Sequence, residues 1–266
     1  QAAVEAVLAA QPVPTEPALA RTLVRSLGPA ATLVVASSMP VRDLEWFGPA
    51  TPAPPRVLAN RGANGIDGTL STALGVAASG RRGRGGEGGS AAGSGSGGRP
   101  PPAAPGSQVP GDGAGAGTGG EGRGPAWPPG LGPGGPVVAL VGDLAFLHDA
   151  GALLGCREGP DLTVVVVDNG GGGIFSFLPQ ARELDGGRFE RLFGTPQPVD
   201  LAGVARAYGA ELSELERVGD LGTALVRAPG SSPVRVVRAR TDRRANVAVH
   251  LELEEAVAAA VGRLGA

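Results

Sequence analysis

Cysteine is nearly absent from this sequence, since Cys156 is the only one among 266 residues. No disulfide can therefore form within the chain, which agrees with a cytoplasmic protein. Cys156 stands in an apolar, helical context, and we interpret it as a small core residue rather than a nucleophile. A signal segment with a basic start and an apolar centre is also missing. The chain begins with Gln1 rather than Met, so we expect it to be a fragment.

An excess of charge of one sign and long apolar runs are lacking as well. The net charge is −2 at pH 7, and the arginines of the glycine-rich stretch are diluted among Gly and Ser. We therefore expect no nucleic-acid partner. The longest apolar runs fall far short of the roughly 20 residues that a membrane-spanning helix needs, so we expect no integral membrane segment. With 42% hydrophobic residues, the chain can nevertheless bury a substantial core.

One segment of low complexity divides the chain. Residues 80–136 hold 23 of the 47 glycines and 10 of the 25 prolines, with almost no apolar periodicity. This composition predicts a disordered insertion. A tolerated loop expansion is favoured over a partner-binding segment, because closure entropy grows slowly with loop length. We expect residues 15–266 to form one domain that the insertion interrupts, and residues 1–14 to be a linker or the tail of a preceding domain.

Apolar strand patterns alternate with helical patterns along the rest of the chain. This order predicts an α/β fold, an open parallel sheet with helices on both faces. Thr15 can cap the first helix, with Pro17 at an early position that suits it. The expected strands are residues 31–36, 56–59, 137–141, 162–167 and 234–239, and the expected helices are residues 17–27, 68–78, 201–208, 221–227 and 251–264.

Polar residues follow two of these strands directly. Gly142, Asp143 and Leu144 come after residues 137–141, and Asn169 and Gly171 come after residues 162–167. Because parallel strands present their carboxyl ends at one edge of a sheet, these residues can face a common point. Carboxylate, amide and backbone carbonyl oxygens suit Mg²⁺, with Mn²⁺ as an alternative, and a helix beginning near residue 145 would direct N–H groups toward an anion. The pattern predicts a site for magnesium and a diphosphate.

The spacing of these motifs resembles that of the thiamine-diphosphate (ThDP) enzymes, whose signature is Gly-Asp-Gly followed later by Asn-Asn. Leu144 replaces the last glycine of that signature, and Asp168 replaces the first asparagine. Together with the motifs at residues 38–43, 60–68 and 174–179, the chain is similar to the MenD family. These enzymes are the 2-succinyl-5-enolpyruvyl-6-hydroxy-3-cyclohexene-1-carboxylate synthases of menaquinone biosynthesis. The resemblance covers most of the chain outside residues 80–136.

The resemblance implies a ThDP-binding fold and a two-stage reaction. ThDP, bound through Mg²⁺ or Mn²⁺, would decarboxylate 2-oxoglutarate, and the resulting carbanion would add to isochorismate. In this family the carboxylate that activates ThDP lies on a separate domain of a partner subunit, so the resemblance implies a homo-oligomer with a shared site. We therefore expect no catalytic residue in this chain, weak ThDP binding by the chain alone, and no turnover.

The resemblance also implies roles for individual residues. Ser38, Arg42 and Arg61 would bind substrate, because arginine holds carboxylates in bidentate pairs. Asp143, Asn169 and the backbone of Gly171 would bind the metal. The residues expected to contact the cofactor are Gly62, Ile66, Gly142, Asp143, Leu144, Asn169, Gly171, Ile174, Phe175 and Leu178.

Plainer interpretations remain open for several of these residues. The arginines could be ordinary surface residues, Ile66 an ordinary core residue, and the apolar residues after 173 a helix face packed on a sheet. His148 is better explained as a solvated or packing histidine than as a proton carrier. Asp168 adds a carboxylate near the metal that could alter its affinity.

Other functions share parts of this sequence pattern. A different ThDP-dependent 2-oxoacid decarboxylase would share the metal motif, and a degenerate, non-catalytic protein of the ThDP fold would retain it in part. A nucleotide-binding module of Rossmann type is disfavoured, because no G-x-G-x-x-G opens a helix after the first strand.

Overall fold

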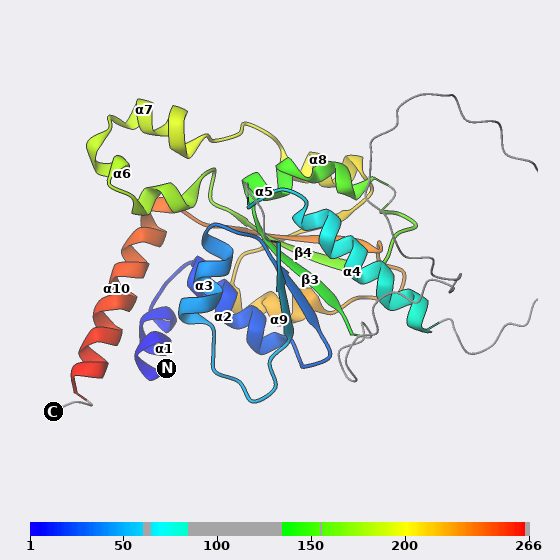
Figure 1. Ribbon diagram of the computed structural model, residues 1–266, viewed down its shortest axis with the longest axis horizontal. Helices are drawn as coiled ribbons and strands as arrows, with labels where there is room; N and C mark the ends of the chain where they lie inside the picture. Colours follow the sequence, from blue (N-terminus) through cyan, green and yellow to red (C-terminus); the bar gives the residue numbers. More distant parts are fainter. Residues whose placement is uncertain (61–64, 85–134, 155, 264–266) are drawn as a thin grey trace, which may run out of the picture.

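A six-stranded, entirely parallel sheet forms the centre of the computed structural model (Figure 1), which describes residues 1–60, 65–84, 135–154 and 156–263. The strand order is β2-β1-β3-β4-β6-β5, so the two most apolar strands, β3 and β4, lie side by side in the interior. The strands are β1 (Thr32–Val35), β2 (Arg56–Ala59), β3 (Val137–Gly142), β4 (Leu162–Asp168), β5 (Glu211–Leu215) and β6 (Val234–Arg240). The expectation of an open parallel sheet is confirmed.

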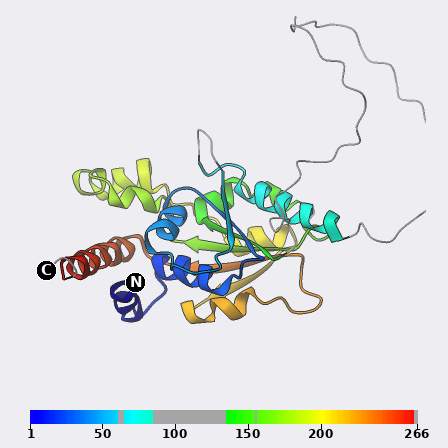
Figure 2. The ribbon, with the colours of Figure 1, turned by 60° about the horizontal axis from the view of Figure 1, so that its bottom comes forward.

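Helices cover both faces of the sheet, as expected (Figures 1 and 2). Successive residues of a strand point to opposite faces. Leu140 accordingly packs toward α2 (Glu16–Ser26) and α9 (Leu221–Leu225), and Val141 packs toward the other face. The helices on that other face are α4 (Thr69–Arg84), α5 (Asp143–His148) and α8 (Leu201–Ala207). Two buried cores therefore hold the sheet between them.

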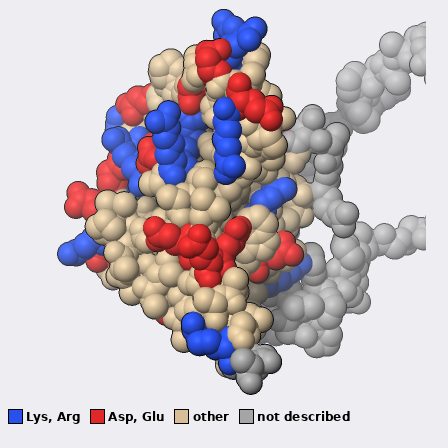
Figure 3. Space-filling model, turned by 90° about the vertical axis from the view of Figure 1, so that its left-hand side faces the viewer, with Lys and Arg blue, Asp and Glu red and all other residues tan. Residues whose placement is uncertain are grey.

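A third, smaller core joins the ends of the described chain. Val4 of α1 (Ala2–Ala9) packs with Val249 and Leu253 of α10 (Arg243–Gly262), and Phe47 of α3 (Met39–Phe47) completes the cluster. Figure 2 shows α1 and α10 next to each other. On the face that carries α10, acidic and basic side chains are interspersed rather than sorted into one large patch (Figure 3).

Helix starts follow from local hydrogen bonding. The side chain of Thr15 accepts a hydrogen bond from the backbone N–H of Ala18, which confirms it as the cap of α2. Asp242 caps α10 by accepting from the N–H groups of Arg244 and Ala245 at 2.9 and 2.8 Å. Because of this cap, α10 begins at Arg243 and not at residue 251, where the amphipathic pattern placed its start.

Other boundaries also differ from the expected ones. Helix α4 continues to Arg84, so residues 80–84 belong to its last turns although composition placed them in the insertion. Helices α1 and α3 and strand β5 were not predicted. Short elements complete the described fold: η1 (Ala150–Leu153), η2 (Gly173–Phe177), α6 (Gln180–Glu183), α7 (Gly186–Phe189), the π-helical turn η3 (Glu190–Gly194) and η4 (Val218–Asp220).

Cys156 and His148, to which the sequence assigns no catalytic role, have ordinary environments. Cys156 is 2% exposed and its thiol donates to the backbone oxygen of Tyr208 at 2.9 Å, in a turn rather than a helix. The core interpretation is thus confirmed. His148 is exposed, and its Nδ1 lies 3.0 Å from an oxygen of Asp67. Within the described residues, no helix combines the length and apolar character needed to cross a membrane.

Candidate functional site

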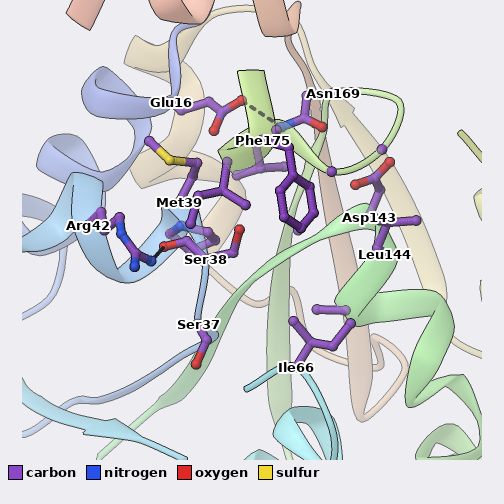
Figure 4. Close-up of a pocket in the computed structure, with 18 of the residues that line it drawn as sticks. Glu16, Ser37, Ser38, Met39, Arg42, Ile66, Asp143, Leu144, Asn169 and Phe175 are labelled. Carbon is purple, nitrogen blue, oxygen red and sulfur yellow. Dashed lines mark hydrogen bonds between the residues drawn. The ribbon is translucent and has the colours of Figure 1, made fainter. Parts of the chain in front are cut away.

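A cavity of about 420 Å³ opens at the carboxyl ends of β1, β3 and β4. Figure 4 shows how residues far apart in the sequence converge there. Most of the expected site residues line it, namely Ser38, Arg42, Ile66, Gly142, Asp143, Leu144, Asn169, Gly171, Ile174 and Phe175. Residues that were not predicted also line it, among them Glu16, Ser37, Met39 and Val167.

One described residue that the sequence predicted for the site, Leu178, is not part of this cavity lining. Leu178 directly follows η2 and is 40% exposed, so the structure does not place it in the expected cofactor wall. Arg61 and Gly62 lie outside the described residues.

Asp143 is the first residue of α5 and is only 6% exposed. Burial raises the pKa of its carboxyl to about 6, while a backbone hydrogen bond from Leu144 opposes the rise and the Asp168 carboxylate adds to it. A second backbone hydrogen bond, from Gly171, also favours the ionised form. A buried carboxylate of this kind gains free energy when a cation binds next to it.

The amide of Asn169 has one satisfied end and one unsatisfied end. Its Nδ2 donates a hydrogen bond to Oε1 of Glu16 at 2.8 Å. Its Oδ1 is buried and has no hydrogen-bond partner in the described part of the chain. A buried acceptor without a partner costs about 1–3 kcal/mol, so a ligand that satisfies it would be stabilised. In Figure 4 this oxygen points toward the side of the cavity where Asp143 lies.

Glycines bring the loop after β4 close to its neighbours. Gly171 has a φ of +137°, and a Cβ atom built on it would lie 2.1 Å from the backbone oxygen of Gly194. A Cβ atom on Gly173 would lie 2.5 Å from Nδ2 of Asn169. Neither position tolerates a side chain in this conformation, so the loop geometry around the Asn169 amide depends on glycine.

The other end of the cavity combines a guanidinium group with an unusual backbone. Nη1 of Arg42 donates to the backbone oxygen of Ser38 at 2.7 Å. Ser38 has a φ of +73°, which is uncommon for a residue with a side chain and indicates a conformation held by its surroundings. In Figure 4, Phe175 lies between this end and Asp143, and Ile66 lies below them.

The oxygen atoms at the site suit a cation that is bound by carboxylate, amide and backbone carbonyl oxygens together. Among the described residues, no group of three or more His, Cys, Asp or Glu side chains could hold a metal. The expected set needs only the one carboxylate of Asp143, together with the amide oxygen of Asn169 and the carbonyl of Gly171. The buried carboxylate and the unsatisfied amide oxygen therefore fit a hard divalent cation.

Glu16 is the main site residue that sequence reasoning missed. It is the first residue of α2 and follows the capping threonine, so its local pattern predicts only the start of a helix. An acidic residue at that position is common, because it complements the helix dipole. No local signal shows that it meets Asn169, which is 153 residues away.

Comparison with known proteins finds one matching family model and several similar enzymes. The family model "Thiamine pyrophosphate enzyme, C-terminal TPP binding domain" matches residues 86–239. The 2-succinyl-5-enolpyruvyl-6-hydroxy-3-cyclohexene-1-carboxylate synthase of Myxococcus xanthus is 40% identical over 262 residues, which are 98% of this chain and 35% of that protein. The enzyme of the same name from Rubrobacter xylanophilus is 36% identical over 239 residues, covering 90% of this chain and 32% of that protein.

A solved structure supports the fold independently. The benzoylformate decarboxylase from Polynucleobacter necessarius superposes with a TM-score of 0.53 at 18% identity, covering 88% of this chain and 34% of that chain. At this identity the likeness concerns the fold alone. The chain spans about a third of the length of the curated relatives that it matches.

Proposed function

This chain belongs to the thiamine pyrophosphate enzymes and matches their C-terminal TPP-binding domain, and we propose that its cavity holds the diphosphate of ThDP through one divalent cation. The observation that supports this most directly is the buried, unsatisfied Oδ1 of Asn169. Together with the buried Asp143 carboxylate, it supplies the oxygen ligands that a hard cation prefers.

The cation would be Mg²⁺, with Mn²⁺ as an alternative. Asp143, Oδ1 of Asn169 and the carbonyl of Gly171 would provide its protein ligands. Phosphate oxygens and water would complete the coordination, since Mg²⁺ usually keeps several ligands that do not come from the protein.

We further propose that the full protein is a MenD-type synthase. Its substrates would be 2-oxoglutarate and isochorismate, and the reaction would serve menaquinone biosynthesis. The support is the identity to the two synthases described above over most of this chain. The chemistry that bound ThDP supplies is an electron sink for the loss of CO₂ from a 2-oxoacid.

The chain's own residues would bind, orient and shield the reactants. Arg42 lines the cavity at the end opposite Asp143 and would pair with a substrate carboxylate, beside the backbone of Ser38. Ile66, Ile174 and Phe175 would form an apolar wall that keeps water from the reacting carbon. Arg61 would add a second guanidinium group.

The site as proposed is shared between subunits of a cytoplasmic homo-oligomer. The carboxylate that activates ThDP would come from a domain outside this sequence, supplied by a partner subunit. The isolated chain would then bind ThDP weakly and would not turn over.

The experiment that tests this function measures isochorismate consumption by the full-length protein that contains this chain. The assay includes 2-oxoglutarate, ThDP and Mg²⁺, and compares wild type with Asp143→Ala. Asp161→Ala is the matched control, because this carboxylate is 65% exposed and pairs with Arg227, away from the cavity. Consumption that needs every component and is lost only in Asp143→Ala supports the proposal.

Two other outcomes would contradict it. Folded, ThDP-bound protein that uses pyruvate in place of 2-oxoglutarate, or spares isochorismate, would be another ThDP-dependent decarboxylase. Protein that binds no ThDP in the presence of Mg²⁺ would be a degenerate member of the fold.

A further inference from the structure

We propose that Glu16 is a positioning residue for the cation site: it holds the amide of Asn169 so that Oδ1 faces the cation. This inference rests on the proposed function, because it concerns the same cation and the same asparagine. It adds a residue from the start of the chain to a site that otherwise comes from the loops after β3 and β4.

The geometry begins with one carboxylate oxygen that receives two donors. Oε1 of Glu16 accepts from Nδ2 of Asn169 at 2.8 Å and from the hydroxyl of Thr241 at 3.2 Å. Glu16 is 3% exposed, so water does not compete strongly for these hydrogen bonds. The carboxylate thus joins the start of α2 to the loops that follow β4 and β6.

This arrangement determines which end of the Asn169 amide faces the cation. An asparagine amide has a donor end and an acceptor end, and Oε1 of Glu16, which accepts two hydrogen bonds, can pair only with the donor end. With Nδ2 directed to Glu16, Oδ1 is left buried and without a partner in the described residues. The reversed amide would present two N–H groups to the cation and would repel it.

Packing around the amide agrees with a fixed position. A Cβ atom on Gly173 would come within 2.5 Å of Nδ2, so the backbone of η2 lies directly against this nitrogen. The absence of a side chain at Gly173 leaves the space that the donor end of the amide occupies when it bonds to Glu16.

Burial makes a purely structural role for Glu16 unfavourable. Its carboxyl group is 3% exposed and has therefore lost most of its hydration. An apolar side chain would fill the same space without this cost. A role in orienting Asn169 accounts for a carboxylate at this position, and partners in the shell around metal ligands act in this way in other sites.

The test measures metal affinity directly, without turnover. Mn²⁺ is titrated into the full-length protein with saturating ThDP, and free Mn²⁺ is followed by electron paramagnetic resonance. We expect Glu16→Ala to weaken Mn²⁺ binding by about 10- to 100-fold. Glu16→Gln should bind Mn²⁺ nearly as well as wild type, because the amide oxygen of Gln can accept the same two hydrogen bonds.

A double-mutant comparison separates positioning from general stability. If Glu16 acts through Asn169, then Glu16→Ala should cause no further loss of Mn²⁺ affinity in an Asn169→Ala background. Thr241→Val, which removes only the second donor to Oε1, should cause a smaller loss than Glu16→Ala and serves if Glu16→Ala does not fold. Thermal unfolding without metal identifies variants whose fold has changed.

The possible failures are distinguishable. Wild type that does not bind Mn²⁺ with ThDP would overturn the proposed function and this inference together. Wild type that binds, with folded Glu16→Ala binding equally well, would overturn the inference alone. So would equal losses in Glu16→Gln and Glu16→Ala, since these would point to charge rather than to amide orientation.

Discussion

The backbone N–H of Gly172 donates a hydrogen bond of 2.7 Å to the backbone oxygen of Gly194. This contact attaches the loop after β4 to the end of η3, across 22 residues of sequence (194 − 172). The same carbonyl oxygen is the one that a Cβ atom on Gly171 would strike. The position of the loop after β4, which carries the proposed cation ligands Asn169 and Gly171, therefore depends on a close approach of two backbone segments.

The substitution Gly171→Ala should disturb this approach. A left-handed φ of +137° and a Cβ atom 2.1 Å from a carbonyl oxygen should together cost about 1–3 kcal/mol of stability and weaken Mg²⁺-dependent ThDP binding about tenfold or more. Isothermal titration of ThDP in the presence of Mg²⁺ measures the second effect. Gly170→Asn is the matched control, because a Cβ atom there meets nothing within 4 Å and asparagine tolerates its φ of +75°. Equal losses in both variants would contradict the prediction.

Asp168 should have only a modest influence on cation binding, although it replaces an asparagine of the ThDP signature and its carboxylate acts on Asp143. Its Oδ2 lies 3.7 Å from Nη1 of Arg238, and it does not line the cavity. Arg238 also pairs with Glu214, so Asp168 belongs to a charge network with these two residues rather than to the cavity lining. We expect Asp168→Asn to change the Kd for Mg²⁺ by no more than about fivefold, which corresponds to about 1 kcal/mol. A Mg²⁺ titration with ThDP present measures this, and a larger change would show that Asp168 acts on the metal.

Removal of one member of the buried pair of Asp43 and His250 should be strongly destabilising. Oδ1 of Asp43 lies 2.8 Å from Nε2 of His250, and both side chains are 2% exposed. Burial raises the pKa of Asp43, and the contact with His250 opposes the rise. We expect His250→Leu to lower the free energy of unfolding by about 3–5 kcal/mol, because it leaves a buried carboxylate without its partner.

Urea denaturation of three variants checks the coupling within this pair. The double variant Asp43→Leu/His250→Leu should be more stable than His250→Leu alone, because it removes the isolated carboxylate. A double variant whose loss equals the sum of the two single losses would show that the residues are not coupled.

The attachment of α1 should weaken in acid. Hydrogen bonds from Arg25 and Arg21 lower the pKa of Glu5 from 4.5 to about 2. A carboxyl whose pKa is lower in the folded state stabilises the fold above its unfolded pKa, and this contribution is lost as the pH falls through the folded pKa. The stability difference between wild type and Glu5→Gln should therefore shrink between pH 4.5 and pH 2. Because Glu5 is 41% exposed, the effect should be modest. A difference that stays constant across this range of pH would contradict the assignment.

Much of the sheet could be predicted because its interior strands carry an unmistakable pattern. Residues of β3 and β4 form continuous apolar runs, which strands covered on both faces require. Strand β5 is an edge strand with an exposed, charged sequence, so it lacks that pattern. The start of α10 was missed because Asp242, rather than amphipathic spacing, determines it.

The site could be predicted only where its residues follow strands directly. Asp143 and Asn169 each come at or just after the end of a strand, and parallel register brings both to one edge. Glu16 could not be found in this way, because its contact with Asn169 depends on how α2 packs beneath the sheet. The MenD resemblance supplied substrate roles for Ser38 and Arg42 that spacing alone could not supply, and these roles remain predictions.

The burial of Cys156 makes this protein convenient for site-specific labelling. Burial raises the pKa of its thiol, and a hydrogen bond to Tyr208 occupies it, so it should react slowly with maleimides while the protein is folded. A cysteine introduced at Leu154 or Val226, which are 80% and 71% exposed, would then be the one reactive thiol among the described residues. Fluorophores or spin labels could thus be attached at chosen points without first removing the native cysteine, and distances between labels on different copies would test the proposed assembly.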